Sequence, residues 1–183
     1  MNSKKLSQRD FLKMSAAGCG TLLALGAGAA PESGDKRFRI GVFDSRAVAV
    51  AYGNSPVGHK SLAAIRADYD KAKEAKDDKR MKEIENQMQT RQRRQHEQGF
   101  STGSVANLLE AVKAELPNVA KSHGVDAIVS KWELAFASPA VETVDVTDAL
   151  VKVFNPSEQG LKWIRDLLKQ KPVPMDELPG DLD

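Results

Sequence analysis

The pattern of apolar and polar positions predicts a strand near residue 40 and a helical arm soon after it. Apolar and polar residues alternate over 38–44, which is the period of a half-buried strand. Residues 59–98 contain no Gly or Pro and are rich in Ala, Lys, Glu, Gln and Arg, the composition of a helix. Between these segments, residues 53–58 hold Gly, Asn, Ser and Pro and predict a break.

Two apolar stripes run along this arm. The first has the 3-4-3 spacing of a coiled coil, and the second lies about two residues out of phase with it; they are Leu62, Ile65, Tyr69 and Ala72, then Met81, Ile84 and Met88. A chain reversal over 76–79, with Asp77 or Asp78 capping the second helix, would let the stripes face each other as a short antiparallel hairpin. One continuous helix with a register slip is the alternative.

A second helix and a pair of strands are predicted after the arm. The helix covers 104–123, should be kinked or restarted at Pro117, and should end at Gly124. Two short runs of strand formers within 126–138 predict a β-hairpin.

The last third of the chain predicts two more helices. They cover 147–154 and 156–170, and the second has Asn155 as its N-cap and Pro156 as its first residue. The Pro-rich tail over 171–183 should be extended. The order of elements therefore predicts an α+β fold, in which a small antiparallel β body carries a coiled-coil-like helical arm inserted after the first strand.

The N-terminus has the features of an export signal. A basic segment through Lys13 precedes an uncharged apolar stretch, and residues 27–29 read Ala-Gly-Ala, a small-x-small cleavage pattern. We expect a signal peptide over 1–29 and a single mature domain over 30–183, located in the periplasm or cell envelope. Residues 7–13 resemble the twin-arginine motif, but Gln8 replaces its first arginine, so the export route stays open. Acylation of Cys19 as a lipoprotein is the less favoured alternative.

Removal of the signal peptide changes the net charge and the cysteine content of the chain. Four of the 27 basic residues and one of the 25 acidic residues lie within the first 29, so the mature chain is close to neutral and gives no electrostatic reason to expect nucleic-acid binding. It also loses Cys19, the only cysteine, and with it any disulfide or thiolate site. No further segment predicts a membrane span.

The mature chain contains no recognisable catalytic or nucleotide-binding motif. His59, His96 and His123 lack metal-ligand spacing. The basic run over 91–96 could hold phosphates or acidic clients, although a solvated helix end is the simpler interpretation. We expect no enzyme, no cofactor and no metal.

Three segments carry a resemblance to a known family: residues 124–129 (Gly-Val-Asp-Ala-Ile-Val), 134–141 (Leu-Ala-Phe-Ala-Ser-Pro-Ala-Val) and 145–150 (Asp-Val-Thr-Asp-Ala-Leu). Together with the first strand and the charged helical insertion, they resemble the Skp/OmpH family of periplasmic chaperones over about 38–154. The resemblance implies a homotrimer whose strands form a common body and whose helical arms enclose unfolded outer-membrane proteins. The arm is short for that family, and the chain continues beyond residue 154 with segments that the resemblance does not explain.

The sequence therefore predicts an ATP-independent holdase that binds unfolded envelope or outer-membrane proteins. A non-catalytic envelope scaffold or adaptor, which would bind a folded partner through the arm, is the alternative. The candidate client-binding residues lie on the arm, where flexible Met side chains suit varied apolar partners; they are Tyr69, Met81, Ile84 and Met88.

Overall fold

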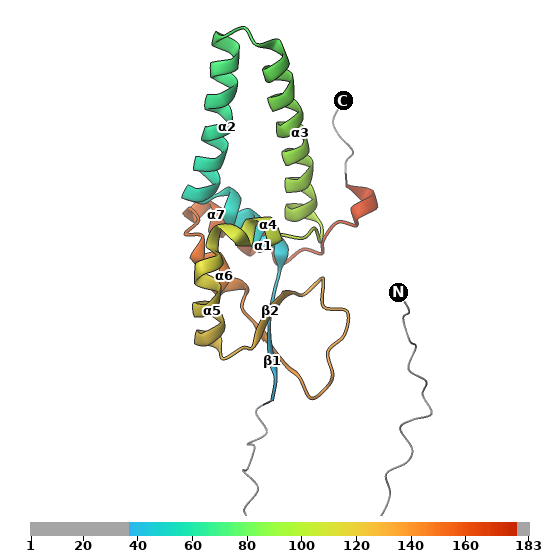
Figure 1. Ribbon diagram of the computed structural model, residues 1–183. Coiled ribbons are helices and arrows are strands. Elements are labelled where there is room, and N and C mark those ends of the chain that lie inside the picture. Colours follow the sequence, from blue (N-terminus) through green and yellow to red (C-terminus); the bar gives the residue numbers. More distant parts are fainter. Residues whose placement is uncertain (1–36, 179–183) are drawn as a thin grey trace, which may run out of the picture. The chain divides into compact units, whose positions relative to one another are not determined.

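The computed structural model describes residues 37–178 (Figure 1). The predicted signal peptide, with Cys19, and the last five residues of the Pro-rich tail lie outside the described residues. The helices and strands appear in the order β1 (Arg39–Phe43), α1 (Ser45–Gly53), α2 (Pro56–Glu74), α3 (Asp78–Phe100), α4 (Ala106–Leu109), η1 (Glu110–Glu115), α5 (Leu116–His123), β2 (Ala127–Ser130), β3 (Glu142–Asp145), α6 (Thr147–Val153), α7 (Glu158–Leu167) and η2 (Met175–Glu177).

The three strands form a parallel sheet in the order β2-β1-β3. The predicted antiparallel body is therefore wrong, and so is the predicted hairpin over 126–138. β2 corresponds to the first of the two runs from which the hairpin was predicted. The second run, residues 133–138, forms an irregular connection, and the third strand of the sheet is β3. The alternation of side chains identifies a strand but carries no information on its direction, which long-range pairing with β1 decides.

Within residues 37–178, helices cover only one face of this sheet. Gly41 pairs with Ile128 on one side and with Val144 on the other, so these three residues point to the same face. Ile128 and Val144 pack against the hydrophobic core on that face. Ile40 and Val42 point to the opposite face and are only half-buried.

Helix α1 is the centre of the core. It contacts α2, α3, α4, α6 and α7, and its residues Ala47, Val48 and Ala51 are fully buried. The sequence left this apolar segment unassigned because it is short and begins directly after the strand. Asp44 makes the transition possible, since its side chain accepts a hydrogen bond from the Arg46 amide as the N-cap of α1.

The arm is a helical hairpin of α2 and α3, as predicted for the reversal over 76–79 (Figure 1). Lys76 takes the left-handed conformation, with φ of 52°, and Asp77 caps α3 by accepting from the Arg80 amide at 2.9 Å. The hairpin begins earlier than predicted, at Pro56, because buried Ser55 caps α2 through the Gly58 amide. The two helices therefore reach from the body to a tip at 75–77.

The predicted helix over 104–123 is divided into three short pieces. Its backbone leaves helical geometry at Val112, with φ of −126°, and η1 is a 3₁₀ segment. Pro117 then lies in the first turn of α5, which confirms the expected restart at this proline. Gly124 ends α5 with φ of +60°, also as predicted, and the Val125 amide donates to the Ala120 carbonyl.

The first C-terminal helix, α6, begins at Thr147 as predicted, whereas α7 begins at Glu158, two residues later than predicted. Ser157, and not Asn155, caps α7 by accepting from the Gly160 amide at 3.2 Å. Asn155 instead has a left-handed backbone, with φ of 49°, directly after α6. The tail continues through irregular residues 171–174 into η2, and the Val173 amide donates to the Phe100 carbonyl at the end of α3. Within residues 37–178 no helix combines the length and apolar character needed to cross a membrane.

The joint between α1 and α2 yields a prediction about stability. A Cβ atom added at Gly58 would overlap the Tyr52 carbonyl oxygen, whereas one added at Gly53 would meet nothing within 4 Å. Gly58→Ala should therefore lower the free energy of unfolding by about 1–3 kcal/mol through overpacking. Gly53→Ala is the matched control and should leave it unchanged or slightly higher. Urea unfolding followed by circular dichroism measures both, and equal effects of the two substitutions would contradict the tight joint.

Candidate functional site

The four residues predicted to bind clients lie along the arm, but they differ in exposure. Ile84 is 1% exposed and closes the seam between α2 and α3. Tyr69 is half-buried, and its hydroxyl donates to Glu85 at 3.0 Å across the hairpin. Met81 is half-buried, whereas Met88 is exposed. Met88 is therefore the one member of this set whose side chain a client can reach without a change in the hairpin.

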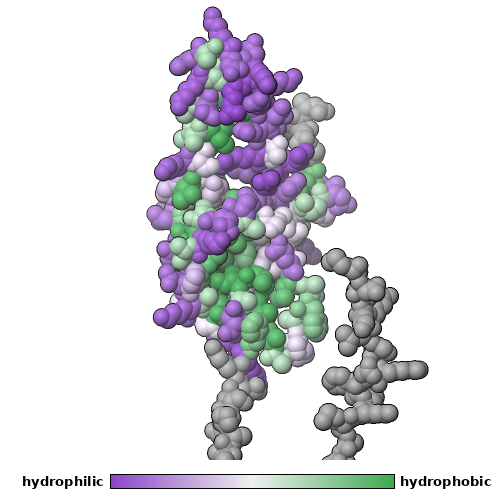
Figure 2. Space-filling model, in the orientation of Figure 1, coloured by the Kyte–Doolittle hydropathy of each residue, from purple (hydrophilic) through white to green (hydrophobic). Residues whose placement is uncertain are grey.

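A larger apolar surface lies on the body. Phe38 precedes β1 on the same face as Ile40 and Val42, the face that no helix covers, and it is exposed. The connection from β2 to β3 adds Phe136, which is 79% exposed. Hydrophobic residues gather over this part of the surface, while the arm is mainly hydrophilic (Figure 2). Phe136 was predicted to lie in the second strand of the hairpin. Because that strand does not form, its side chain is left exposed.

The edges of the sheet add unpaired backbone groups to this surface. β2 and β3 each pair only with β1 within the described part of the chain. The amides of Glu142 and Val146 donate to carbonyls of the β1 segment, so those of Thr143 and Asp145 point away from it. Such an edge is a template for pairing with another strand.

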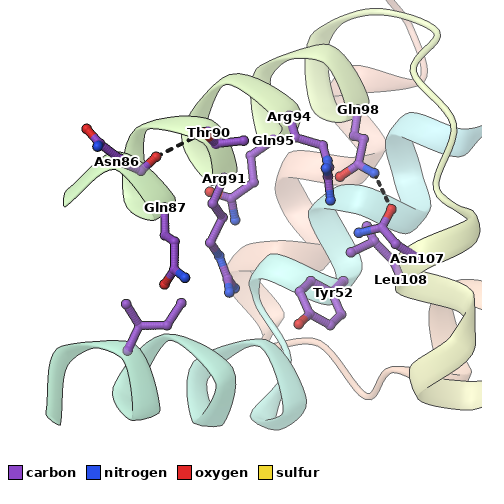
Figure 3. A pocket seen from close by; sticks show the side chains of 11 residues that line it. Tyr52, Asn86, Gln87, Thr90, Arg91, Arg94, Gln95, Gln98, Asn107 and Leu108 are labelled. Carbon is purple, nitrogen blue, oxygen red and sulfur yellow. Dashed lines mark hydrogen bonds between the residues drawn. The ribbon is translucent and has the colours of Figure 1, made fainter. Parts of the chain in front are cut away.

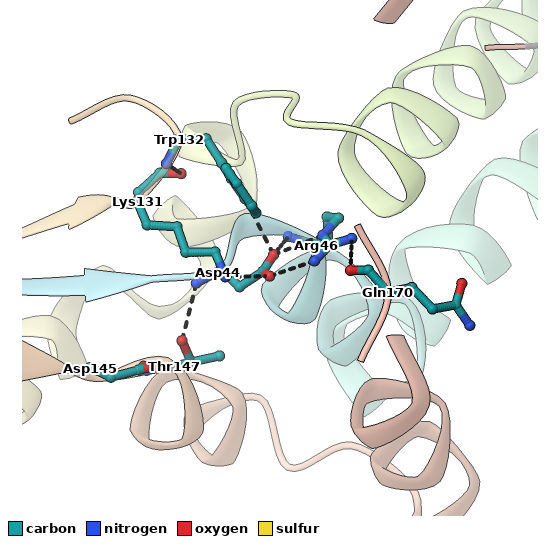
Figure 4. Close-up of polar contacts among 8 residues, drawn as sticks. Asp44, Arg46, Lys131, Trp132, Asp145, Thr147 and Gln170 are labelled. Carbon is teal, nitrogen blue, oxygen red and sulfur yellow. Dashed lines mark hydrogen bonds and ion pairs between the residues drawn. The ribbon is translucent and has the colours of Figure 1, made fainter. Parts of the chain in front are cut away.

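A buried ion pair occupies the carboxyl end of the sheet (Figure 4). The Asp44 and Arg46 side chains are 1% and 3% exposed, and Arg46 contacts both carboxylate oxygens, with Nη2 2.8 Å from Oδ2 and Nε 3.1 Å from Oδ1. Lys131 adds a second cation 2.9 Å from Oδ2. The Trp132 indole donates to Oδ1 at 3.4 Å, and the Lys131 ammonium lies 4.5 Å from the centre of that ring.

The same cluster ties together segments that are distant in sequence. Asp44 follows β1, Lys131 follows β2, and the Thr147 hydroxyl at the start of α6 accepts from the Asp44 amide at 3.1 Å. Arg46 Nη1 donates to the Gln170 carbonyl beyond α7 at 3.0 Å. No sequence pattern connects these positions, because the parallel sheet brings them together and the predicted antiparallel one does not.

The electrostatics of Asp44 favour a structural role over acid–base chemistry. Burial by itself would raise the pKa of Asp44, but hydrogen bonds from Arg46 and Lys131 outweigh this effect and lower the pKa from 3.8 to about 2. A carboxylate with so low a pKa is a weak base near neutral pH. Elsewhere in residues 37–178, no group of three or more His, Cys, Asp and Glu side chains is arranged to hold a metal ion.

Comparisons with protein-family models, with curated proteins and with solved structures find no match to this chain.

The low pKa of Asp44 predicts a specific acid sensitivity. Because the folded-state pKa lies below the ordinary value, the stabilisation is complete above about pH 4 and is lost as pH falls toward 2, which amounts to about 2 kcal/mol. Asp44→Asn should remove this pH-dependent contribution. At pH 7 it should also lower the free energy of unfolding by about 3–5 kcal/mol, because Arg46 loses its anionic partner in a buried site.

Urea unfolding between pH 2 and pH 7 measures both effects. Asp148→Asn, at an exposed position on α6, is the control and should behave like the unmodified protein. A parallel pH dependence in the Asp44→Asn variant and the unmodified protein would contradict the assignment of the acid-labile stability to Asp44.

Proposed function

We propose that this protein is an exported, non-catalytic holdase of the cell envelope that keeps unfolded proteins from aggregating, without ATP. The observation that carries the proposal is the extent of apolar side chains left exposed on the body and at the base of the arm. Phe136, Phe100 and Trp163 are 79%, 53% and 52% exposed. Exposed apolar patches of this kind mark surfaces that bind protein or membrane.

The order of elements supports a relation to the Skp/OmpH family as part of this proposal. A first strand and the short helix α1 are followed by a helical hairpin, by three short helical pieces, by two further strands of the same sheet, and by a helix that begins at Thr147 after the Asp145 turn. The residues that resemble the family fall on β2, on the β2–β3 connection and on the junction of β3 with α6. A holdase needs many weak contacts and no reaction chemistry, which agrees with surfaces that are apolar and varied.

We propose further that three copies of the chain assemble through the sheet. Three strands of four or five residues make a sheet too small to protect its own edges. Its uncovered face presents Ile40 and Val42, and Phe136 lies on the adjoining connection. Pairing of β3 with β2 of a neighbouring copy would satisfy both edges and bury the apolar face at once.

This assembly can be tested at one residue of the sheet edge. Residues 30–183 should have a solution mass, measured by light scattering, of three times that of one chain. The Thr143 amide points away from β1, so Thr143→Pro removes a donor from the outer edge and should shift the protein toward monomers. Thr143→Val keeps the amide and is the control. A fully folded, monomeric unmodified protein would rule out the assembly.

Chaperone activity can be tested on the arm. If clients cover Met88, the exposed member of the set, its side chain contributes about 1 kcal/mol of binding, so Met88→Gln should require about fivefold more protein for equal protection. Suppression of the aggregation of an unrelated unfolded protein, followed by light scattering, is the measurement. Solution mass and thermal unfolding of the body should stay the same.

Ile84→Gln tests the stability of the hairpin separately from client binding at its surface. Because Ile84 is buried between the helices, this substitution should cost about 3 kcal/mol of arm stability and lower its helicity. Undiminished protection by the Met88→Gln variant would exclude Met88 as a client contact. If the unmodified protein protects no unfolded client but binds one folded partner, the protein is an adaptor, and the holdase proposal fails.

A further inference from the structure

The seam between the arm helices changes character along its length. Near the tip it is closed by Met81 and Ile84 of α3. Toward the body, polar residues of α3 replace the apolar ones beside this seam, and Gln87, Arg91 and Gln98 line the space between the helices. Seam positions between two helices are normally apolar, and polar residues there reduce stability. The helices do not close over this stretch but leave a cavity of about 460 Å³.

Two arginines give this cavity an unbalanced positive charge. Arg91 and Arg94 extend from α3 toward the side of the cavity where Tyr52 of α1 lies (Figure 3). The Arg91 guanidinium is held in place, since its Nη1 donates to the Ser61 hydroxyl of α2 at 2.9 Å. None of the eleven lining residues is acidic. A pair of guanidinium groups in such a setting favours an anion, and a planar carboxylate or a phosphate matches its donors best.

The remaining wall of the cavity is rich in side-chain amides. Gln98 is almost completely buried, and its Nε2 donates to the Ser104 carbonyl and to Asn107 Oδ1, each at 2.7 Å. Gln87 and Gln95 line the same space. The amides of Gln87 and Gln95 each offer a donor and an acceptor, so these two side chains can pair with the N–H and C=O groups of a polypeptide backbone.

A second groove of about 420 Å³ adjoins this cavity at the base of the arm. The linings of the two spaces have Tyr52, Gln95, Gln98 and Leu108 in common. Phe100 and Trp163, both about half exposed, form part of the groove. A ligand that spans both spaces therefore has an anionic end, hydrogen-bonding groups behind it and an apolar part beside them.

We propose that this composite site holds the C-terminal carboxylate of an unfolded polypeptide, with the apolar side chains of its last residues in the groove. A fatty acid would supply the carboxylate and the apolar part, but it would leave the amide wall without backbone groups to pair with. A free phosphate would leave the groove unused. The inference rests on the proposed function, since it identifies the part of an unfolded client that this protein recognises.

Peptide binding tests the site directly. A fluorescently labelled six-residue peptide that ends in Leu-Phe with a free carboxylate is titrated with the protein and followed by anisotropy, next to the same peptide with an amidated C-terminus. Amidation removes the charged acceptor and should weaken binding at least tenfold. Arg91→Gln with Arg94→Gln should weaken binding of the carboxylate peptide to the level of the amidated one.

The control is Lys60→Gln with Arg66→Gln, which removes the same net charge from exposed positions of α2 outside the cavity. It should leave the affinity for the carboxylate peptide within twofold of the unmodified protein. Equal binding of the two peptides, or equal weakening by both double variants, would overturn the proposal. So would displacement of the peptide by decanoate or inorganic phosphate at a lower concentration than that of unlabelled peptide.

An aggregation assay run in parallel separates this inference from the proposed function. If the protein suppresses aggregation but does not distinguish the two peptides, the carboxylate site is wrong and the holdase proposal stands. If it selects the carboxylate peptide but protects no unfolded protein, the site stands and the holdase proposal fails.

Discussion

The buried pair of Asp44 and Arg46 is the interaction on which the arrangement of the body depends. It fixes the start of α1 on the end of β1, and the same two side chains reach Lys131 after β2 and the Gln170 carbonyl after α7. Two desolvated charges are costly unless each is fully paired, so the surrounding segments are held in the positions that supply the partners. The parallel sheet, the central helix and the C-terminal segment are thereby specified together.

The prediction from sequence succeeded where the information is local. The reversal at Lys76 and Asp77, the restart at Pro117 and the end of α5 at Gly124 each depend on residues within a few positions of one another. The direction of the strands failed, because it depends on pairing across more than eighty residues of chain. The helical nature of α1 was missed for a different reason, since this apolar segment is short and begins directly after the strand.

The candidate surfaces could be predicted only in part. Periodicity placed Met81, Ile84 and Met88 on one stripe of the arm, but it could not say that Ile84 is buried and Met88 is exposed. The exposure of Phe136 and the uncovered face of the sheet follow from the topology of the strands. Likewise, the cavity between α2 and α3 requires Tyr52 and Asn107 from outside the arm. These features need the three-dimensional arrangement and have no signature in the spacing of residues.

In the proposed holdase, the short arm would limit how much of a client the protein can surround. α2 has 19 residues and so spans about 28 Å, because an α-helix rises about 1.5 Å per residue. An unfolded chain of about 100 residues has a radius of gyration near 30 Å, so its full extent is far larger than the height of this arm. Arms of this length can shield a segment of such a chain or a small compact domain, while the remainder stays in solvent. In the proposed assembly, a long client would therefore bind several copies, each at a different segment along its length.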